Sequence, residues 1–234
     1  MSGISNRDLQ FFDPSADHTV VWKNLPHFAQ AGTLCFITWR TADSLPASAV
    51  EKLSKEREVM LQQHGIHPTG SWRESLAALK PEIRGKVHWS LFKAWDQVLD
   101  HACGACVLKR PELARIVMDS LLHFDNDRYL LTDAVIMPNH VHLIAAFRDE
   151  VSLLKQCKSW KHFTATQINR VLWNEGPADG AAGLRGKTEF WQPEQFDHLI
   201  RSEADFVRYR QYIVDNPEAA KLKSDESLHY SRPF

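Results

Sequence analysis

The sequence predicts an α+β protein in which helices pack on one face of a small antiparallel sheet. Two observations lead to this class. Segments with strand periodicity alternate with amphipathic helical segments, in the order strand, helix, insertion, helix, strand, strand, helix, strand, helix. Two of the strands are separated by only a few residues, so they can pair antiparallel through a tight turn. This order is typical of helices that cover one face of an antiparallel sheet.

The first elements surround an insertion. Residues 1–32 are rich in polar and turn-forming residues and are expected to form an irregular leader. Residues 33–40 alternate in the manner of a strand. A helical pattern over residues 47–65 ends at a glycine, and residues 66–110 add shorter helical segments broken by prolines and glycines. We therefore expect residues 42–110 to include a helical insertion.

The middle of the chain supplies a helix and a strand pair. Residues 111–124 begin with proline and place their apolar side chains on one helical face. Two apolar segments follow, at residues 129–137 and 140–147, and a Pro-Asn break separates them. We expect these two segments to be neighbouring strands.

Two further helices complete the predicted fold. A long helix is expected over residues 151–173, followed by a mobile loop rich in glycine and alanine at residues 174–187. A short strand and a turn lie within residues 188–200. The final helix, over residues 202–217, begins with a serine cap and acidic residues and ends at Pro217.

The composition indicates a packed protein of a reducing compartment. Hydrophobic residues make up 44% and charged residues 24% of the 234 residues, which is enough for a core. The formal net charge of −1 counts against a broad electrostatic surface for duplex DNA. We find no signal peptide, no apolar segment of about 20 residues and too few cysteines for a disulfide framework. A cytoplasmic location is expected.

Two histidines in an apolar strand are the first candidate functional residues. His140 and His142 are two residues apart, so their side chains share one face of a strand. Two neutral imidazoles can bind one divalent metal. Alternatively, both histidines are half-exposed and bond to water or to the backbone. Their apolar surroundings favour the metal site, because burying imidazoles without partners is costly.

The final helix offers a nucleophile and a third ligand. Tyr212 and Asn216 are spaced i, i+4 and share one helical face. A tyrosine hydroxyl is a weak nucleophile at its usual pKa of about 10, and a metal that polarises a phosphate makes its attack feasible. Alternatively, Tyr212 packs in a helix interface and Asn216 with Pro217 only marks the helix end.

Five segments, in this order, resemble the single-tyrosine HUH transposases, and most closely the REP-associated tyrosine transposases (RAYTs). The resemblance extends over roughly residues 32–222. The segments are "FITWRT" at 36–41, "MPNHVHLI" at 137–144, "KSWKHFTATQIN" at 158–169, "FWQPEQFDHLIRSEADF" at 190–206 and "YIVDNP" at 212–217.

The resemblance implies a fold, a site and a reaction. The fold would be a ferredoxin-like or RRM-like sheet with the histidine pair on a central strand. His140, His142 and Asn216 would bind Mg²⁺ or Mn²⁺, and Tyr212 would be the nucleophile. The enzyme would cleave and rejoin single-stranded or hairpin DNA, such as REP-like elements, through a 5′-phosphotyrosine intermediate. Neither a nucleotide cofactor nor a membrane is expected.

Several basic and polar residues are candidates for DNA binding. Lys158, Lys161 and Arg208 could contact phosphates, since such contacts need only proximity. Alternatively, they belong to ordinary solvated helix faces. Three more polar residues of uncertain role lie in a segment that the resemblance places near the site, and the acid among them could orient a metal ligand. These residues are Gln192, Asp197 and His198.

The predicted domain boundaries and the alternatives complete the sequence-based expectations. The transposase-like domain is expected over residues 33–222, followed by a tail at 223–234. A monomer is favoured over a dimer. Two other functions stay open: an inactive nucleic-acid-binding module of the same fold, and a zinc hydrolase that uses the H-x-H pair. Cys103 and Cys106 have C-x-x-C spacing but no second pair, which argues against a structural zinc site.

Overall fold

A computed structural model of the chain describes residues 9–22, 26–45, 47–67, 72–80, 83–87, 89–90, 93–94, 104–149, 152–174 and 189–233. The chain divides into two compact units, one formed by residues 1–42 with 105–234 and one by residues 43–104. Residues 175–187 of the predicted mobile loop lie outside the described residues, as does Cys103, while Cys106 is half-buried. Among the described residues, no helix has the length and apolar character needed to cross a membrane.

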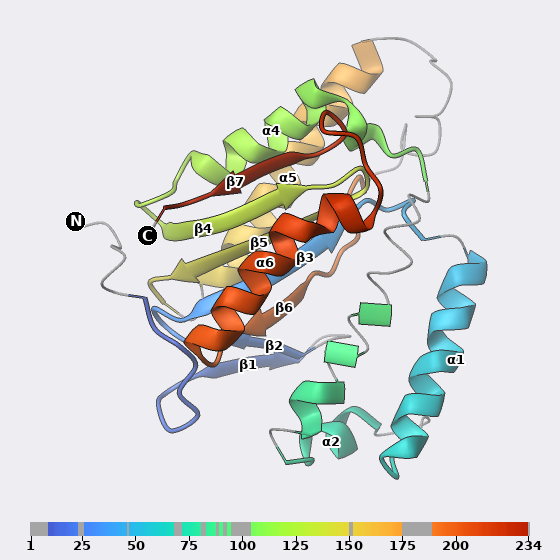
Figure 1. Cartoon of the computed structure of the whole chain (residues 1–234), viewed down its shortest axis with the longest axis vertical. Helices are drawn as coiled ribbons and strands as arrows, with labels where there is room; N and C mark the ends of the chain where they lie inside the picture. The colour runs from blue at the N-terminus through green and yellow to red at the C-terminus, as the bar shows by residue number, and fades with distance from the viewer. Residues whose placement is uncertain are drawn as a thin grey trace. The chain divides into compact units, whose positions relative to one another are not determined.

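The larger unit contains all the described strands and three of the longer helices (Figure 1). Its elements are β1 (Thr19–Trp22), β2 (Pro26–Ala29), β3 (Leu34–Arg40), η2 (Val107–Lys109), α4 (Pro111–Leu122), β4 (Tyr129–Ile136), β5 (His140–Phe147), α5 (Ser152–Asn174), β6 (Phe196–Leu199), α6 (Glu203–Ala219) and β7 (Leu228–Ser231).

Two segments expected to be irregular contain strands. The leader forms the antiparallel pair β1–β2, and the C-terminal tail supplies β7. Both segments are short and carry weak apolar periodicity. Their strand structure depends on pairing with a neighbour, which local sequence does not reveal.

The main sheet has the strand order β6-β3-β5-β4-β7, and every neighbouring pair is antiparallel. The segment β3-α4-β4-β5-α5-β6 follows the β-α-β-β-α-β pattern of ferredoxin-like folds, and β7 extends the sheet at the β4 edge. The predicted α+β class is confirmed. The histidine-bearing strand β5 lies at the centre of this sheet.

Helices cover both faces of the sheet, whereas the sequence predicted one. Phe36 and Ile37 are consecutive on β3 and therefore point to opposite faces. On the face that Ile37 shares, Trp39 stacks on Trp160 of α5, with ring centroids 5.8 Å apart. On the other face, Phe36 stacks on Tyr209 of α6 at 4.7 Å. Figure 1 shows α6 crossing the face of the sheet opposite to α5.

The last helix extends beyond its predicted end. Ser202 caps α6 as expected, because its hydroxyl oxygen accepts a hydrogen bond from the Asp205 N–H (3.1 Å). The prediction that Pro217 ends the helix is wrong, since α6 runs to Ala219. A proline lacks the N–H that would continue the helical bonding, and its ring crowds the carbonyl four residues earlier, which usually kinks or ends a helix. The N–H of Ala220 still bonds to the Asn216 carbonyl at 3.0 Å, which holds the last turn.

The smaller unit has its own minor core. It contains α1 (Ala47–Gln63) and α2 (Trp72–Ala77), and a further helical turn lies at residues 83–87. Four buried side chains pack together in it: Leu61, Ile66, Leu76 and Val87. This unit ends at residue 104, so residues 105–110, expected within the insertion, belong to the larger unit.

Candidate active site

The histidine pair lies in the middle of the sheet on the face that α6 covers. His140 and His142 are both fully buried, and their ring centroids are 4.6 Å apart. In the β3–β5 register, Thr38 is opposite His142 and Phe36 is opposite Ile144. Since Phe36 contacts α6, the histidines share that face. The alternative that both histidines are half-exposed is therefore wrong, and the pair is buried as its apolar surroundings predicted.

Each imidazole is oriented by an oxygen at Nδ1. His142 Nδ1 lies 2.6 Å from Thr38 Oγ1, and His140 Nδ1 lies 2.7 Å from Asn139 Oδ1. The amide oxygen of Asn139 can only accept, so His140 donates from Nδ1 and its lone pair is on Nε2. The Nε2 atoms of both rings are enclosed by the protein. Nitrogens held this way are suited to bind a metal through Nε2.

α6 brings Tyr212 beside the histidine pair, and Asn216 lies one turn further along the same helix. The Tyr212 ring centroid is 5.6 Å from that of His142 and 5.9 Å from that of Phe36. The Tyr212 hydroxyl oxygen is buried although the residue itself is partly exposed. Asn216, one turn further along α6, is buried, and its Oδ1 makes no hydrogen bond to any described residue. Buried amide oxygens are normally paired with protein, water or an ion, which makes Asn216 Oδ1 a candidate ligand.

A buried ion pair fixes α6 over the sheet. Asp133 on β4 is fully buried, and its Oδ1 accepts hydrogen bonds from Arg210 Nε (3.0 Å) and Ser231 Oγ (2.6 Å). Asp133 is in register with Ile144, two residues beyond His142. The pair therefore anchors the tyrosine helix beside the histidine strand. Sequence reasoning missed it, although an aspartate inside the apolar stretch "LLTDAVI" is an unusual feature.

The donor atoms present fit a divalent ion with mixed nitrogen and oxygen ligands. Within the described ranges, no group of three His, Cys, Asp or Glu side chains could hold a metal. The buried Oδ1 of Asn216 is the candidate for a third protein ligand. Mn²⁺ accepts oxygen donors as well as imidazole, and Mg²⁺ prefers oxygen. The set of His140, His142 and Asn216 leaves further coordination positions for a substrate oxygen.

A second tyrosine on α6 is less suited to act as nucleophile. Tyr209 is 1% exposed and packs between Phe36 and His198, with ring centroids 4.7 and 5.6 Å away. Burial raises the pKa of Tyr209 well above its usual value. Tyr212 is less buried than Tyr209, and its ring lies beside that of His142.

The structure places Asp197 away from the histidine pair. In the β3–β6 register Asp197 is opposite Ile37, so it points to the face that α5 covers. There its carboxylate bonds to Nδ1 of the buried His27. The expectation that Asp197 orients a metal ligand does not agree with this position. His198, the next residue, lies on the α6 face beside Tyr209.

Gln192 and Arg40 frame one end of the site. Gln192 supports the backbone: its N–H bonds to the Arg40 carbonyl, and its side chain donates to the Ala42 carbonyl, both at 2.9 Å. Arg40 is in register with His140 and shares its face. Burial lowers the pKa of the Arg40 guanidinium to about 10, so it remains cationic at neutral pH. The sequence analysis did not include Arg40 among the candidates. Its position at the end of the first predicted strand of the sheet, residues 33–40, is the feature that could have indicated it.

The three predicted phosphate-binding cations lie on separate surfaces. Lys161 supports the following loop, because its ammonium donates to the Pro193 carbonyl at 2.6 Å. Arg208 pairs with Asp205 at 2.8 Å on the exposed side of α6. Lys158 is exposed on α5, on the other side of the sheet. Contact with a DNA strand at the site is therefore not supported for Lys161 or Lys158.

Comparison with known proteins gives limited information. No family model matches the chain, and no curated protein matches it. A solved structure of a REP-associated tyrosine transposase bound to a REP hairpin is 14% identical, and the match covers 82% of this chain and 71% of that one. The TM-score of 0.37 is too low to establish a common function.

Proposed function

We propose that this chain is a metal-dependent enzyme that cleaves and rejoins single-stranded DNA through Tyr212. The proposal is carried by one observation. The ring of Tyr212, a partly exposed residue, lies 5.6 Å between centroids from His142, which is one of two buried and oriented imidazoles. The five sequence segments that resemble the single-tyrosine HUH transposases support the same reaction.

The proposed reaction exchanges one phosphodiester for another. The phenolic oxygen of Tyr212 attacks the phosphorus, the bond to the 3′-oxygen breaks, and the products are a 5′-phosphotyrosine and a free 3′-hydroxyl. The phenolic proton passes to water, and the leaving oxygen takes a proton from water. Rejoining is the reverse reaction with a new 3′-hydroxyl. The phosphotyrosine retains the energy of the broken bond, so no nucleotide cofactor is required.

The residues of the site divide this work. His140, His142 and Asn216 would hold Mg²⁺ or Mn²⁺, which when bound polarises the scissile phosphate. Thr38 and Asn139 keep the imidazoles oriented. Arg40 would neutralise a phosphate near His140. The rigid placement of α6 by the Arg210 ion pair keeps the tyrosine within reach of the substrate.

An unpaired strand is the substrate that this geometry favours. The reacting groups are buried between α6 and the sheet, and a flexible single strand or hairpin end can bend into such a place more easily than a duplex. Hairpins of the REP type are therefore the proposed substrate class. We propose that the chain acts as a monomer, because one chain supplies the histidines, the asparagine and the tyrosine together.

A covalent-capture assay tests the proposal. The protein is incubated with Mn²⁺ and labelled hairpin oligonucleotides taken from the flanks of its own gene, then run on a denaturing gel. We expect a labelled protein band that disappears in Tyr212→Phe and with chelator. Tyr230→Phe is the matched control, since Tyr230 lies on β7 and faces away from α6.

Two outcomes would count against the proposal. Binding of the hairpins without any adduct would favour a nucleic-acid-binding module that lacks chemistry. An adduct that persists in Tyr212→Phe would assign the nucleophile to another residue. The zinc hydrolase alternative expects a closed barrel, whereas the described strands form an open five-stranded sheet.

A further inference from the structure

We propose that the outward face of α5 is a binding surface for single-stranded nucleic acid, separate from the candidate active site. The proposal extends the proposed function, because it names where a strand is held outside the reacting centre. It can be tested without any cleavage, so it can fail independently of the tyrosine chemistry.

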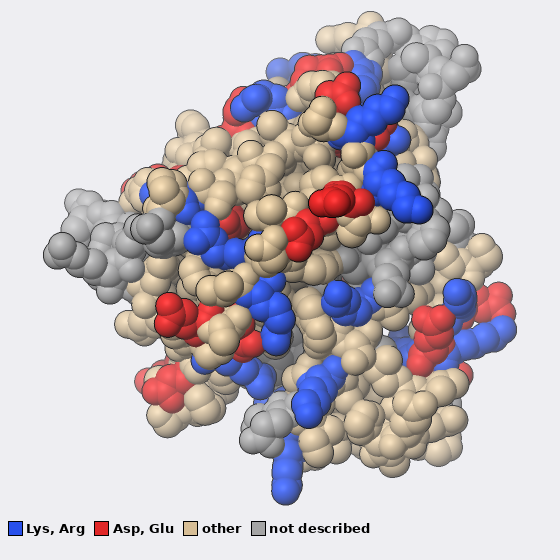
Figure 2. Space-filling view, in the orientation of Figure 1, with Lys and Arg blue, Asp and Glu red and all other residues tan. Residues whose placement is uncertain are grey.

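The charge of α5 differs from that of the whole chain. The chain has 28 basic and 29 acidic residues, yet the 23 residues of α5 include four cations and no aspartate or glutamate. On the face that α6 covers, by contrast, basic and acidic side chains are interspersed (Figure 2). A local excess of cations raises the concentration of a polyanion beside it. The four cations are Lys155, Lys158, Lys161 and Arg170.

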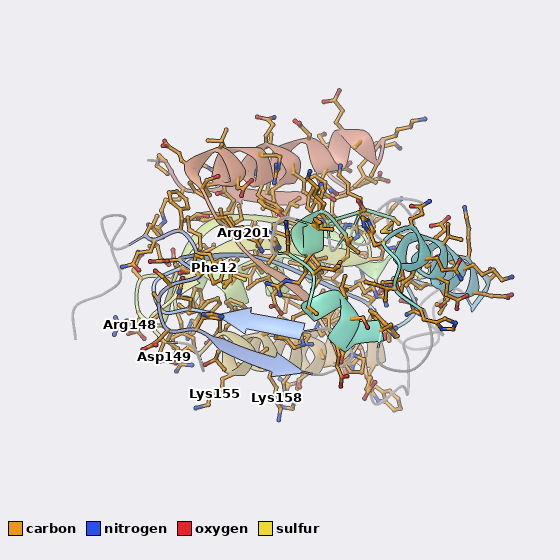
Figure 3. The ribbon with its side chains drawn as sticks, turned by 90° about the horizontal axis from the view of Figure 1, so that it is seen from below. Phe12, Arg148, Asp149, Lys155, Lys158 and Arg201 are labelled. Atoms are coloured by element: carbon orange, nitrogen blue, oxygen red, sulfur yellow. The ribbon has the colours of Figure 1, made fainter. Side chains whose placement is uncertain are left out.

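Three of these cations are available on the outward face. Lys155, Lys158 and Arg170 are exposed, whereas Lys161 is held by the loop that follows α5. Figure 3 shows Lys155 and Lys158 projecting away from the body of the protein, with Arg148 on the same side. Asp149, also on that side, caps α5 by accepting from the Ser152 N–H and hydroxyl, both at 2.8 Å.

Two large aromatic side chains accompany the cations. Phe163 is 50% exposed and Trp173 is 73% exposed, although both belong to a well-formed helix. Trp160, on the inner side of the same helix, is 1% exposed. Isolated apolar side chains on a surface are ordinary, but exposed aromatics beside cations and without acids have the composition of surfaces on which bases stack.

The spacing places Lys155 and Trp173 along one line of the helix, with Lys158 and Phe163 on either side of that line. Eighteen residues complete five helical turns, so Lys155 and Trp173 project in nearly the same direction and lie about 27 Å apart. His162 and Thr166, both exposed, fall between them. A single strand laid along this length would cover roughly four to eight nucleotides, which is within the range of known single-strand sites.

The chemistry identifies the occupant as an unpaired strand. A duplex presents its phosphates but shields the faces of its bases, so it would leave Phe163 and Trp173 without a role. A single strand offers both phosphates for the cations and π-faces for the aromatics. Because α5 and α6 lie on opposite faces of the sheet, this strand segment is distinct from the one at Tyr212.

Two variants of α5 test the surface. Affinity for a labelled 12-nucleotide oligothymidine is measured by fluorescence anisotropy in chelator and in the Tyr212→Phe background, where no cleavage is expected. We expect Lys155→Glu/Lys158→Glu to weaken binding at least tenfold and to lower the salt slope by about 1.4, since two phosphate contacts are lost. Phe163→Ser/Trp173→Ser should weaken binding severalfold with an unchanged salt slope.

The control is Lys221→Glu/Lys223→Glu, which makes the same charge change at two exposed lysines after α6. We expect the control to bind within about threefold of the parent, because its lysines lie outside the proposed surface. Equal weakening by the control and by the α5 charge variant would overturn the proposal. It would also be overturned if both α5 variants bound as the parent does, or if duplex DNA or vesicles with anionic lipid bound in preference to the single strand.

Discussion

The orientation of the two imidazoles determines what the histidine pair can do. Each ring is fixed by a short hydrogen bond at Nδ1, which leaves Nε2 as the nitrogen that would bind the proposed metal. Thr38 belongs to β3, and Asn139 immediately precedes β5. The hydroxyl of Thr38 thus reaches His142 from a strand that is more than a hundred residues earlier in the chain.

Replacing Thr38 tests this orientation. Thr38→Val keeps the shape of the side chain but removes the oxygen, so we expect Mn²⁺ affinity to fall about 10- to 100-fold. Thr38→Ser should retain an affinity close to that of the parent protein. Isothermal titration with Mn²⁺ measures both. Equal affinities for the valine variant and the parent would show that this hydrogen bond has no part in metal binding.

At this scale the sequence predicted the candidate site residues but not the residues that hold them in place. The i, i+2 spacing on a strand and the i, i+4 spacing on a helix identify His140, His142, Tyr212 and Asn216, because local geometry alone sets these directions. The positions of Thr38, Asp197 and Lys161 depend on strand register and loop packing. Register and loop packing are set by residues distant in sequence. The observed positions of Asp197 and Lys161 do not agree with the roles expected for these two residues.

At the scale of the elements, the position of α6 determines which side chains lie beside the histidine pair. Arg210 donates to the buried Asp133, and Tyr209 stacks on Phe36. These contacts place the helix on the histidine face. The sequence predicted the helix and its serine cap but assigned the helices to one face of the sheet, because an amphipathic pattern indicates that a face is buried without indicating against what.

Removing the Arg210 side chain should loosen α6. It would leave the carboxylate of Asp133 buried, with Ser231 as its remaining hydrogen-bond donor among the described residues. We therefore expect Arg210→Ala to lower the free energy of unfolding by about 2 kcal/mol or more. Arg208→Ala, which breaks an exposed pair on the same helix, should cost no more than about 0.5 kcal/mol. Urea denaturation compares the two. Similar losses in both variants would contradict an anchoring role for the buried pair.

The division of the whole molecule into two units suggests that the sheet unit is autonomous. Residues 43–104 form the second unit, and a Cβ on Gly104 would come within 2.8 Å of the Asp43 carbonyl oxygen. The two ends of the insertion therefore lie side by side. Sequence breaks located this insertion, but its C-terminal boundary was placed too late because residues 105–110 carry no signal for the sheet unit.

Deleting the insertion tests this autonomy. A variant in which a short glycine-serine linker replaces residues 43–104 should unfold in one cooperative transition and retain Mn²⁺ affinity within a few-fold of the parent. The physical reason is that the insertion has its own core, and the histidine pair, Tyr212 and Asn216 all belong to the other unit. Circular dichroism melting and titration calorimetry provide the readouts. Failure of the variant to unfold cooperatively would show that the sheet unit depends on the insertion.

The most direct test of the central claim is to locate the covalent bond. After reaction with hairpin DNA and Mn²⁺, nuclease and trypsin digestion separate the two candidate tyrosines of α6. Cleavage after Arg208 and Arg210 puts Tyr209 in a dipeptide and Tyr212 in the peptide of residues 211–221. We predict that mass spectrometry finds a nucleotide phosphate on the peptide of residues 211–221. A nucleotide on Tyr209, or on no tyrosine, would contradict the claim that Tyr212 is the nucleophile.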